Sequence, residues 1–478
     1  MRRTKIVATV GPASRSPQKL EQLVQAGVNV FRLNFSHGSH DEHLAVITSV
    51  REIATRLRKP IALLQDLSGP KIRTGKVKDG AELVNGARIT ITTEPLVEGD
   101  ASLISTTYEA LPHDVKPGDR VLLDDGNLEL RVQRTSGTRV ECEVVDGGPL
   151  RSNKGINLPG VALSTAALTE KDRRDLAFGV QHGVDFIALS FVRQAQDLEQ
   201  ARELVSSLGA RTSLIAKIEK PQALDNLEAI LAVADGVMVA RGDLGVELGT
   251  ENVPIAQKRI IAAANNAGRV VITATQMLES MIENPRPTRA EASDVANAIL
   301  DGTDAVMLSG ESAVGRFPVE TVETMARISL FTEEHGASSI RRRDSRRSDQ
   351  PRGPQAPGTP ITRSLTRVAV SVAEELECKL ILAFTESGIT ARLLAMHRPR
   401  VPVVAVTPSD HVYRQLALSW GVVPVRADLA GSTDDLLTIG EHQLRARGIV
   451  ESGDTILMLS GHSAAAAATN MLRVHTVA

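Results

Sequence analysis

Short, strand-like apolar segments alternate with longer helical patterns along most of this chain of 478 residues. Three strand segments come first and five follow after a break, at residues 5–10, 30–36, 61–66, 185–191, 212–219, 236–243, 269–276 and 305–311. Eight strands that are each followed by a helix are typical of a (β/α)8 TIM barrel, which is an α/β fold. A doubly wound open sheet is the alternative, because a count of elements does not distinguish the two.

The first predicted helix carries signals at both of its ends. Ser16 stands at the expected N-cap, Pro17 takes the first helical position, and Gly27 follows the last helical residues. Serine side chains cap helix N-termini, proline fits the first turn, and glycine commonly ends a helix. We therefore expect a helix that begins at Pro17 and stops at Gly27.

The alternation stops between about residues 70 and 160, where short strands separated by Gly, Asp and Pro predict a small all-β insertion. Six arginines and four prolines between residues 336 and 360 indicate a solvated linker, with a docking or regulatory segment as the alternative. Beyond it, four apolar segments are typical of parallel strands. The expected units are a first barrel part (1–69), the insertion (70–160), a second barrel part (161–337), the Arg/Pro-rich linker (338–360) and a C-terminal α/β domain (361–478).

The composition argues against several classes of function. Lys and Arg number 55 against 57 Asp and Glu, a net charge of -2, so neither nucleic acid nor a membrane is an expected partner. Cys142 and Cys378 lie far apart and form no metal-binding pair, which favours a reducing cytoplasm. The N-terminal apolar run is too short for a signal peptide, and no apolar stretch reaches the ~18 residues of a spanning helix. We expect a cytoplasmic protein.

Polar residues stand at the ends of nearly all the predicted barrel strands. The catalytic groups of a TIM barrel come from the C-terminal ends of its strands, so a functional site is favoured there over a purely structural barrel. The candidates at these ends are Arg32, Asn34, Ser36, His37, Asp66, Ser190, Lys217, Glu219, Arg241, Gly242, Asp243, Thr275, Gln276, Ser309 and Glu311.

Glu219 and Asp243 are hard oxygen ligands at the ends of neighbouring strands, which favours a site for Mg²⁺ or Mn²⁺. Lys217 points to the same face as Glu219 by strand alternation, and its ammonium suits a phosphoryl or enolate oxygen. The alternative is that the two carboxylates cap helices or form ion pairs with Lys217 and Arg241. The chain has no GxxxxGK[ST] motif, so a nucleotide here would not be held by a Walker loop.

Several motifs, in their order along the chain, together resemble pyruvate kinase over nearly its whole length: ATVGPAS, FRLNFSHG, SGPKIRTG, KIE, MVARGDLGVEL, ATQMLESM, PRPTRAEASDVANA and MLSGESAVG. The ATQMLESM segment followed by PTRAE is the most specific of these. The resemblance implies a TIM barrel, an inserted small β-barrel lid domain and a C-terminal α/β regulatory domain. It also implies a homotetramer that transfers the phosphoryl group of phosphoenolpyruvate to ADP, giving pyruvate and ATP.

The resemblance implies roles for the matching residues. Glu219 and Asp243 would bind the divalent metal ion, Lys217 would stabilise the phosphoryl group during transfer, and Arg32 would bind the substrate phosphate. The substrate carboxylate would be held by Gly242, Asp243 and Thr275. A water-linked proton route to the enolate could begin at either Thr275 or Ser309. Nucleotide phosphates would be contacted by Arg73 and Lys154, with Asn34 and His37 nearby.

The loop after the third strand departs from the potassium-dependent members of the family, which carry Glu in place of Lys71 and Thr in place of Leu67. The other implied potassium ligands, Asn34, Ser36 and Asp66, remain. Because an ammonium group is a tethered monovalent cation, we expect Lys71 to replace K⁺. A solvated surface lysine is the alternative. The hypothesis is that activity needs Mg²⁺ or Mn²⁺ but not K⁺.

A second departure lies in the C-terminal domain. The loop Thr385, Glu386, Ser387, Gly388, Ile389 and Thr390 resembles the phosphate-binding loop of members activated by sugar phosphates. Members activated by fructose-1,6-bisphosphate carry an arginine for the second phosphate near the C-terminus, where this chain has none before Arg473. A sugar monophosphate or AMP is therefore the expected effector, and an unused loop is the alternative.

Two rival functions are compatible with parts of this pattern. Another enolpyruvate enzyme of the same barrel and metal chemistry, a carbon–carbon lyase or a phosphomutase, would have no need for the ADP contacts of Arg73 and Lys154. A non-catalytic metabolite sensor would have no need for Lys217, Glu219 and Asp243. Pyruvate kinase is therefore the favoured function.

Overall fold

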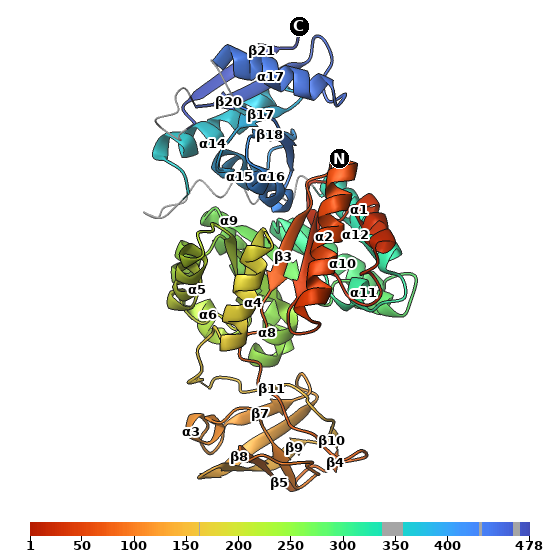
Figure 1. The fold of residues 1–478 in the computed structure, drawn as a ribbon, viewed down its shortest axis with the longest axis vertical. Coiled ribbons are helices and arrows are strands. Elements are labelled where there is room, and N and C mark those ends of the chain that lie inside the picture. The colour runs from red at the N-terminus through yellow and green to blue at the C-terminus, as the bar shows by residue number, and fades with distance from the viewer. Residues whose placement is uncertain (162, 337–356, 430–432, 462–468) are drawn as a thin grey trace.

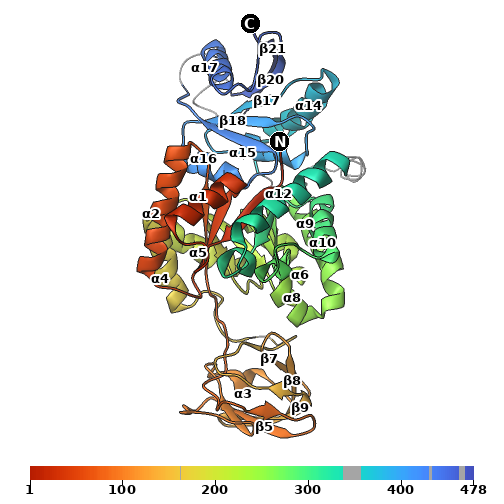
Figure 2. The same ribbon diagram turned by 90° about the vertical axis from the view of Figure 1, so that its right-hand side faces the viewer.

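The computed structural model describes residues 1–161, 163–336, 357–429, 433–461 and 469–478. Three units are stacked along the long axis in both views, with the barrel in the middle (Figures 1 and 2). The β insertion lies at one end of the stack and the C-terminal domain at the other. The N-terminus lies near the junction of the barrel and the C-terminal domain (Figure 1). Most of the predicted linker, residues 338–356, falls outside the described residues.

Eight parallel strands close into a barrel in the order β1-β16-β15-β14-β13-β12-β3-β2, which confirms the predicted TIM barrel over an open sheet. The strands are β1 (Lys5–Thr9), β2 (Val30–Asn34), β3 (Ala62–Asp66), β12 (Phe186–Leu189), β13 (Ser213–Ile218), β14 (Gly236–Ala240), β15 (Val270–Ala274) and β16 (Ala305–Leu308). All positions of β1, β3 and β14 are buried, as expected for strands covered on both faces. Parallel pairing brings the carboxyl ends of all eight strands to one end of the barrel.

Helices cover the outside of the barrel. They are α1 (Pro17–Ala26), α2 (His40–Leu57), α4 (Glu170–Gln181), α5 (Ala195–Ser207), α6 (Pro221–Asp225), α7 (Leu227–Val233), α8 (Arg241–Leu248), α9 (Val253–Asn266), α10 (Arg289–Asp301), α11 (Gly310–Ala313) and α12 (Pro318–His335). The predicted ends of α1 are confirmed: the Ser16 hydroxyl accepts a hydrogen bond from the Lys19 N–H, and Gly27 ends the helix at φ 119°.

The insertion after β3 is built mainly of β-strands. β11, β7, β8, β9, β5 and β6 form a six-stranded sheet, and β10 pairs with β4. Its elements are β4 (Glu82–Leu83), β5 (Arg88–Thr92), β6 (Leu103–Ser105), α3 (Leu111–Asp114), β7 (Arg120–Leu123), β8 (Leu128–Ser136), β9 (Arg139–Asp146), β10 (Gly148–Pro149) and β11 (Ile156–Asn157). The unit has its own apolar core, to which Ile91, Val121 and Leu130 belong, so it packs as a domain of its own.

The C-terminal domain has a five-stranded sheet in the order β19-β18-β17-β20-β21. Its elements are α14 (Pro360–Glu375), β17 (Ile381–Phe384), α15 (Ile389–Met396), β18 (Val403–Thr407), α16 (Asp410–Gln415), β19 (Val422–Arg426), α17 (Thr433–Arg445), β20 (Thr455–Ser460) and β21 (Met471–Thr476). The four predicted strands are present and parallel. Strand β21 was not predicted, and it pairs antiparallel to β20 at the sheet edge, where alternating polar residues give a weak apolar signal.

The C-terminal domain closes the amino end of the barrel. Ala417 and Leu418 are buried in the same apolar cluster as the barrel residues Val7 and Met238. Across this junction the Arg398 guanidinium forms an ion pair with Asp304 at 2.6 Å. Because the C-terminal domain covers the amino end, the carboxyl end of the barrel is the end available for a functional site.

The described residues contain no helix with the length and apolar character needed to cross a membrane.

Lys5 lies at the junction of the barrel and the C-terminal domain, where its ammonium donates a hydrogen bond of 2.8 Å to the Val422 carbonyl of the C-terminal domain. Burial, helped by the nearby charge of Arg2, lowers the pKa of Lys5 to about 7, against the opposing charges of Glu333 and Asp304. Between pH 7 and the ordinary lysine value, the unfolded chain therefore binds more protons at this residue than the folded chain. In that window, Lys5 makes the free energy of unfolding rise with pH.

We predict that Lys5→Met flattens this rise. Urea unfolding at several pH values between 7 and 9.5 measures it, with the parent protein gaining stability faster than the variant as pH increases. Equal slopes for the two proteins would show that Lys5 is not held with a lowered pKa.

Candidate active site

Four charged side chains from three strands meet at the carboxyl end of the barrel. The Arg32 Nε on β2 donates to the Asp66 Oδ2 on β3 at 2.7 Å. The Lys217 Nζ on β13 lies 3.3 Å from the Asp66 Oδ1 and 2.8 Å from the Glu219 Oε1. Asp66 and Glu219 are buried, and only 11% of the Lys217 side chain is exposed. The structure thus joins Arg32, Asp66, Lys217 and Glu219 in one continuous array of alternating charge, which we call the charge array.

The members of the charge array determine each other's protonation. Burial would raise the pKa of Asp66, but the charges of Lys217 and Arg32 hold it below its usual value. Burial would lower the pKa of Lys217, but Asp66, Glu219 and Asp243 together raise it. For Glu219, burial dominates and raises the pKa, with Asp243 acting in the same direction against Lys217. Lys217 is therefore a permanently charged ammonium at neutral pH.

Ser190 and Phe191, which follow β12, complete the surroundings of Lys217 and Glu219. The Lys217 Nζ donates to the Ser190 Oγ at 2.7 Å, and the Phe191 N–H donates to the Glu219 Oε2 at 2.6 Å. Phe191 has φ 56°, a left-handed conformation that is rare for a bulky residue and typical of a functional site. Sequence reasoning noted Ser190 only as a strand end and missed Phe191, because an apolar residue that acts through its backbone has no side-chain signal.

The turn at the start of α8 meets the end of β15. The Gly242 N–H donates to the Thr275 Oγ1 at 2.8 Å, so these two predicted residues are in contact. Thr275 has φ 68°, a strained conformation for a β-branched residue, and Gln276 next to it has φ 53°. Asp243 is half-buried in the first turn of α8, and its charge acts on both Lys217 and Glu219. The Gly242–Thr275 hydrogen bond therefore connects the turn that carries Asp243 to the end of β15.

The residues at this end of the barrel fit a divalent cation. The Glu219 Oε1 and Asp66 Oδ1 contact Lys217 but accept no well-oriented hydrogen bond from the described residues, although both are buried. Within the described ranges no three or more His, Cys, Asp and Glu side chains gather to hold a metal ion. A Mg²⁺ site commonly uses one or two carboxylates together with substrate oxygens and water. Glu219 and Asp243 provide such a pair.

Ser309, after β16, has a hydroxyl oxygen that is buried without a hydrogen-bond partner in the described part of the chain. Its backbone N–H donates to the Glu311 Oε2 at 2.6 Å, and the Glu311 Oε1 accepts from the Leu278 N–H at 3.1 Å. Glu311 thus links the ends of β16 and β15, where Ser309 and Thr275 stand.

The loops after β2 and β3 hold the residues predicted for the monovalent cation region. The Asn34 Oδ1 accepts from the Ser36 N–H at 3.1 Å, and Asp66 belongs to the charge array. Leu67 is buried, and its carbonyl accepts from the Ser190 Oγ at 2.7 Å. The Lys71 side chain is exposed and makes no ion pair with the described residues. Burial together with the charges of Arg73, Lys71 and Arg32 lowers the pKa of His37.

Arg73 and Lys154 come together where the chain enters and leaves the insertion. Arg73 pairs with Gly155 in an isolated antiparallel bridge, and its Nη1 donates to the Asn153 carbonyl at 2.9 Å. The Lys154 ammonium forms an ion pair with Asp124 at 2.7 Å. A pocket next to Gly155 is lined by Lys71, Asp125 and Asn157 from the insertion and its neck and by Lys220 and Asp243 from the barrel.

The segment Thr385–Thr390 lies in the C-terminal domain and runs from the end of β17 into the first turn of α15, on the far side of the barrel from the insertion (Figure 1). The Thr385 Oγ1 accepts from the Gly388 N–H at 2.9 Å, and Gly388 has φ 77°. The Arg392 Nη2 donates to the Ser387 carbonyl at 2.9 Å. This loop is therefore a compact turn at a helix N-terminus, separate from the site.

This chain is similar to known pyruvate kinases in both sequence and fold. The family "Pyruvate kinase, barrel domain" matches residues 1–322, and the family "Pyruvate kinase, alpha/beta domain" matches residues 363–475. Pyruvate kinase 2 of Synechocystis sp. is 47% identical, over 100% of this chain and 79% of its own. A pyruvate kinase of Clostridium perfringens is 43% identical over 100% of both chains. The crystal structure of a pyruvate kinase from Cryptosporidium parvum has a TM-score of 0.93 and 34% identity, covering 100% of this chain and 96% of that one.

We predict that Lys217→Met destabilises the fold, because it leaves Asp66 and Glu219 as buried carboxylates without their shared cation. Breaking a buried charge pair from one side costs about 3–5 kcal/mol of unfolding free energy. Urea unfolding in EDTA at pH 8 measures the loss. Lys76→Met, at an exposed lysine with no ion pair among the described residues, is the matched control. A Lys217→Met variant as stable as this control would contradict the prediction.

Proposed function

Because the chain belongs to the pyruvate kinase family, whose members are phosphotransferases, we propose that it transfers the phosphoryl group of phosphoenolpyruvate to ADP, giving pyruvate and ATP. The observation that carries the proposal is the charge array, in which Lys217 stands charged between Asp66 and Glu219 with Arg32 alongside. A phosphoryl group in transfer carries its charge on oxygens, and catalysis consists mainly of positioning and electrostatic stabilisation. Two fixed cations, Arg32 and Lys217, beside the proposed metal ligands Glu219 and Asp243 supply that environment.

The proposed roles follow the geometry of the site. Arg32, oriented by Asp66 and by a 3.1 Å contact with the Thr9 hydroxyl, binds the substrate phosphate. Lys217 stabilises the phosphoryl group as it moves. Glu219 and Asp243 would hold Mg²⁺ or Mn²⁺, and the bound ion would neutralise charge on the substrate oxygens. The substrate carboxylate is held at the turn made by Gly242, Asp243 and Thr275.

Protonation of the enolate completes the reaction. Thr275 and Ser309 both lie at the ends of neighbouring strands, β15 and β16, which are linked through Glu311. The Thr275 hydroxyl already accepts from Gly242 and donates to the Ala274 carbonyl at 2.7 Å, whereas the buried Ser309 hydroxyl has no described partner. This difference favours Ser309 as the group that orients a proton-carrying water.

ADP is proposed to lie between the insertion and the barrel, with its phosphates near Arg73 and Lys154. The pocket at the neck of the insertion supports this place, and Asn34 and His37 stand at the adjoining loop. A lyase or phosphomutase of similar barrel chemistry would not need these cations, and a non-catalytic sensor would not need the charge array.

The monovalent cation, the effector and the assembly of the protein are also proposed here. Lys71 is proposed to supply the monovalent charge, so that K⁺ is not required. The loop Thr385–Thr390 is proposed to bind a sugar monophosphate or AMP, with its hydroxyls and turn N–H groups directed at phosphate. The working assembly is proposed to be a homotetramer in the cytoplasm, with the insertion acting as a lid over the site.

Pyruvate formation from phosphoenolpyruvate and ADP, followed by coupling to lactate dehydrogenase, tests the proposed reaction. We expect pyruvate only when both substrates and Mg²⁺ or Mn²⁺ are present. Consumption of phosphoenolpyruvate without ADP would favour a lyase or mutase, and no turnover with either metal would favour a sensor. Added glucose 6-phosphate, ribose 5-phosphate and AMP, tested one at a time at low phosphoenolpyruvate, test the effector loop.

We predict that Lys71→Glu creates a potassium requirement. The substitution replaces a tethered cation by a carboxylate, which leaves net negative charge near Asn34, Ser36 and Asp66 for a free cation to neutralise. Initial rates in sodium-only buffer, with and without added KCl, measure the effect. The parent is expected to be insensitive to KCl and the variant to be activated by it. A parent that gains strongly from KCl would contradict the role of Lys71.

A further inference from the structure

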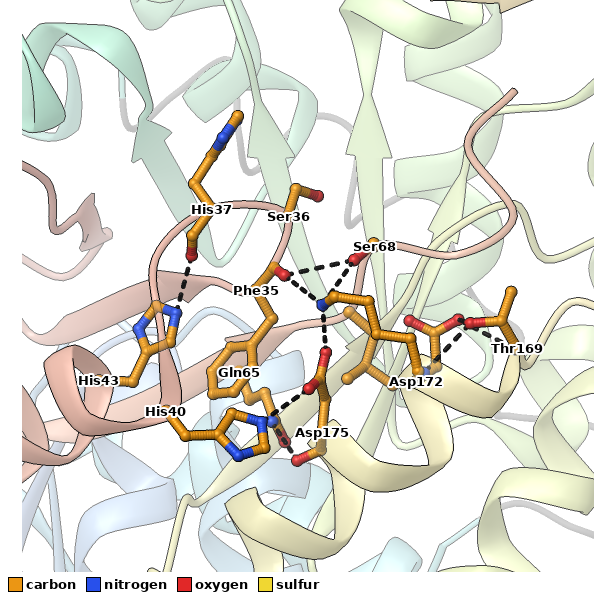
Figure 3. A network of polar contacts seen from close by, with 12 residues as sticks. Phe35, Ser36, His37, His40, His43, Gln65, Ser68, Thr169, Asp172 and Asp175 are labelled. Atoms are coloured by element: carbon orange, nitrogen blue, oxygen red, sulfur yellow. Dashed lines mark hydrogen bonds and ion pairs between the residues drawn. The ribbon is translucent and has the colours of Figure 1, made fainter. Parts of the chain in front are cut away.

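The first turn of α4 contacts the loops that follow strands β2 and β3, next to the charge array. Asp172 is buried, and its Oδ1 accepts a hydrogen bond of 3.1 Å from the Gly69 N–H in the loop after β3. Its Oδ2 accepts from the Thr169 N–H at 3.0 Å, which caps the same helix. Figure 3 shows Thr169 and Asp172 at the start of the helix, beside Ser68 and the loop that carries Ser36 and His37. The N-terminus of α4 is therefore hydrogen-bonded to the loop after β3.

Lys171 makes the closest of these contacts. Its ammonium donates to the Phe35 carbonyl at 2.7 Å, lies 2.5 Å from the Asp175 Oδ2 and reaches the Ser68 Oγ at 3.4 Å. Phe35 belongs to the loop after β2, and Ser68 belongs to the loop after β3. The Ser68 hydroxyl also donates to the Phe35 carbonyl at 3.3 Å. One ammonium thus joins the two loops through two oxygens, of Phe35 and Ser68, and joins both to α4 through Asp175.

Asp175 fixes this ammonium from the helix side. The carboxylate is buried and also accepts from the His40 Nε2 at 2.8 Å, as Figure 3 shows. The Asp175 carbonyl accepts from the Gln65 Nε2 on β3 at 2.6 Å. The Gln65 side chain is packed against Gly179, where a Cβ atom would lie 2.0 Å from the Gln65 Oε1. Asp175 is therefore hydrogen-bonded to β3 itself, at Gln65, which immediately precedes Asp66.

The contacts of Lys171 fix geometry at the site. Its side chain is half-exposed, at 52%, whereas the Asp175 carboxylate that it contacts is buried. The groups that the ammonium contacts in the two loops directly flank the site, because Phe35 follows Asn34, and Ser68 follows Asp66 by two positions. Small displacements of reacting groups have large effects on phosphoryl transfer, which depends mainly on positioning.

We propose that Lys171 is a positioning residue for the phosphoryl transfer. Its ammonium fixes the loops after β2 and β3 to one another, and thereby sets the distance between Arg32 and Asp66, which form the 2.7 Å contact across the same two strands. This inference rests on the proposed function. It assigns to Lys171 a role distinct from that of Lys71, whose side chain makes no ion pair among the described residues.

Lys171→Met tests the inference, with Arg173→Met as the matched control. Arg173 is two residues along the same helix, carries the same charge, and pairs only with the exposed Glu170 at 3.7 Å among the described residues. We expect kcat to fall about tenfold to a hundredfold in the Lys171 variant, with a smaller change in the KM for ADP. The control is expected to keep the parent kcat. Rates are divided by the folded fraction, measured by circular dichroism.

Chemical rescue distinguishes positioning by the ammonium from a general structural role. The substitution leaves the oxygens of Phe35, Ser68 and Asp175 without their donor, so we expect ammonium chloride to restore part of the lost kcat. Tetramethylammonium chloride at the same ionic strength has no N–H groups, and is expected to restore none. If Lys171→Met does not fold, Lys171→Gln, which keeps an N–H donor, is measured in the same way.

Three outcomes would overturn the inference. The first is a Lys171 variant with the parent kcat per folded molecule. The second is a loss of kcat that ammonium and tetramethylammonium restore equally, and the third is a loss that neither ion restores. The parent protein in the same assay keeps the proposed function separate: absence of pyruvate formation by the parent refutes that function, whereas the ratio of variant to parent rates decides the role of Lys171.

Discussion

The ammonium of Lys217 holds two buried carboxylates, Asp66 and Glu219, that would otherwise repel each other in a medium of low polarity. Its contacts of 3.3 Å and 2.8 Å join β3 to β13, and Asp66 extends the array to Arg32 on β2. A charge this deeply buried is tolerated only when it is paired and hydrogen-bonded. The ends of β2, β3 and β13 must therefore lie at the same height in the barrel, and the closure of its eight parallel strands places them there. The chemistry of the site depends on this alignment.

The backbone around the charge array is already in a costly conformation. Phe191 and Thr275 both have positive φ values, and each uses its position to place a polar contact: the Phe191 N–H on Glu219, and the Thr275 hydroxyl on the Gly242 N–H. Such residues cost free energy, about 1–3 kcal/mol each, and persist where the surrounding structure fixes them. The array is thus preorganised around fixed dipoles and charges, which is the arrangement that stabilises charge in a transition state without reorganisation.

The barrel and most site residues could be predicted from the sequence because their signals are local. Each strand is a short apolar run, and each ends in polar residues such as Arg32, Asp66 or Lys217 that parallel pairing brings to one end. Strand β21 was missed because an edge strand with alternating polar residues has a weak apolar pattern. Phe191 was missed because it acts through its N–H group. Lys171 was missed because its partners, Phe35 and Ser68, lie more than a hundred positions away in the chain, and only the fold brings them together.

The kinetics of Lys217→Met test whether Lys217 stabilises the phosphoryl group during its transfer. If Lys217 stabilises the phosphoryl group during transfer, its loss removes an interaction that is strongest in the transition state, so kcat for pyruvate formation falls by a factor of about 10² to 10³ while the KM for phosphoenolpyruvate changes little. Rates per folded molecule at saturating ADP and Mg²⁺ provide the measurement. A variant that keeps the parent kcat and raises only the KM would show that Lys217 merely binds substrate, and would contradict the account.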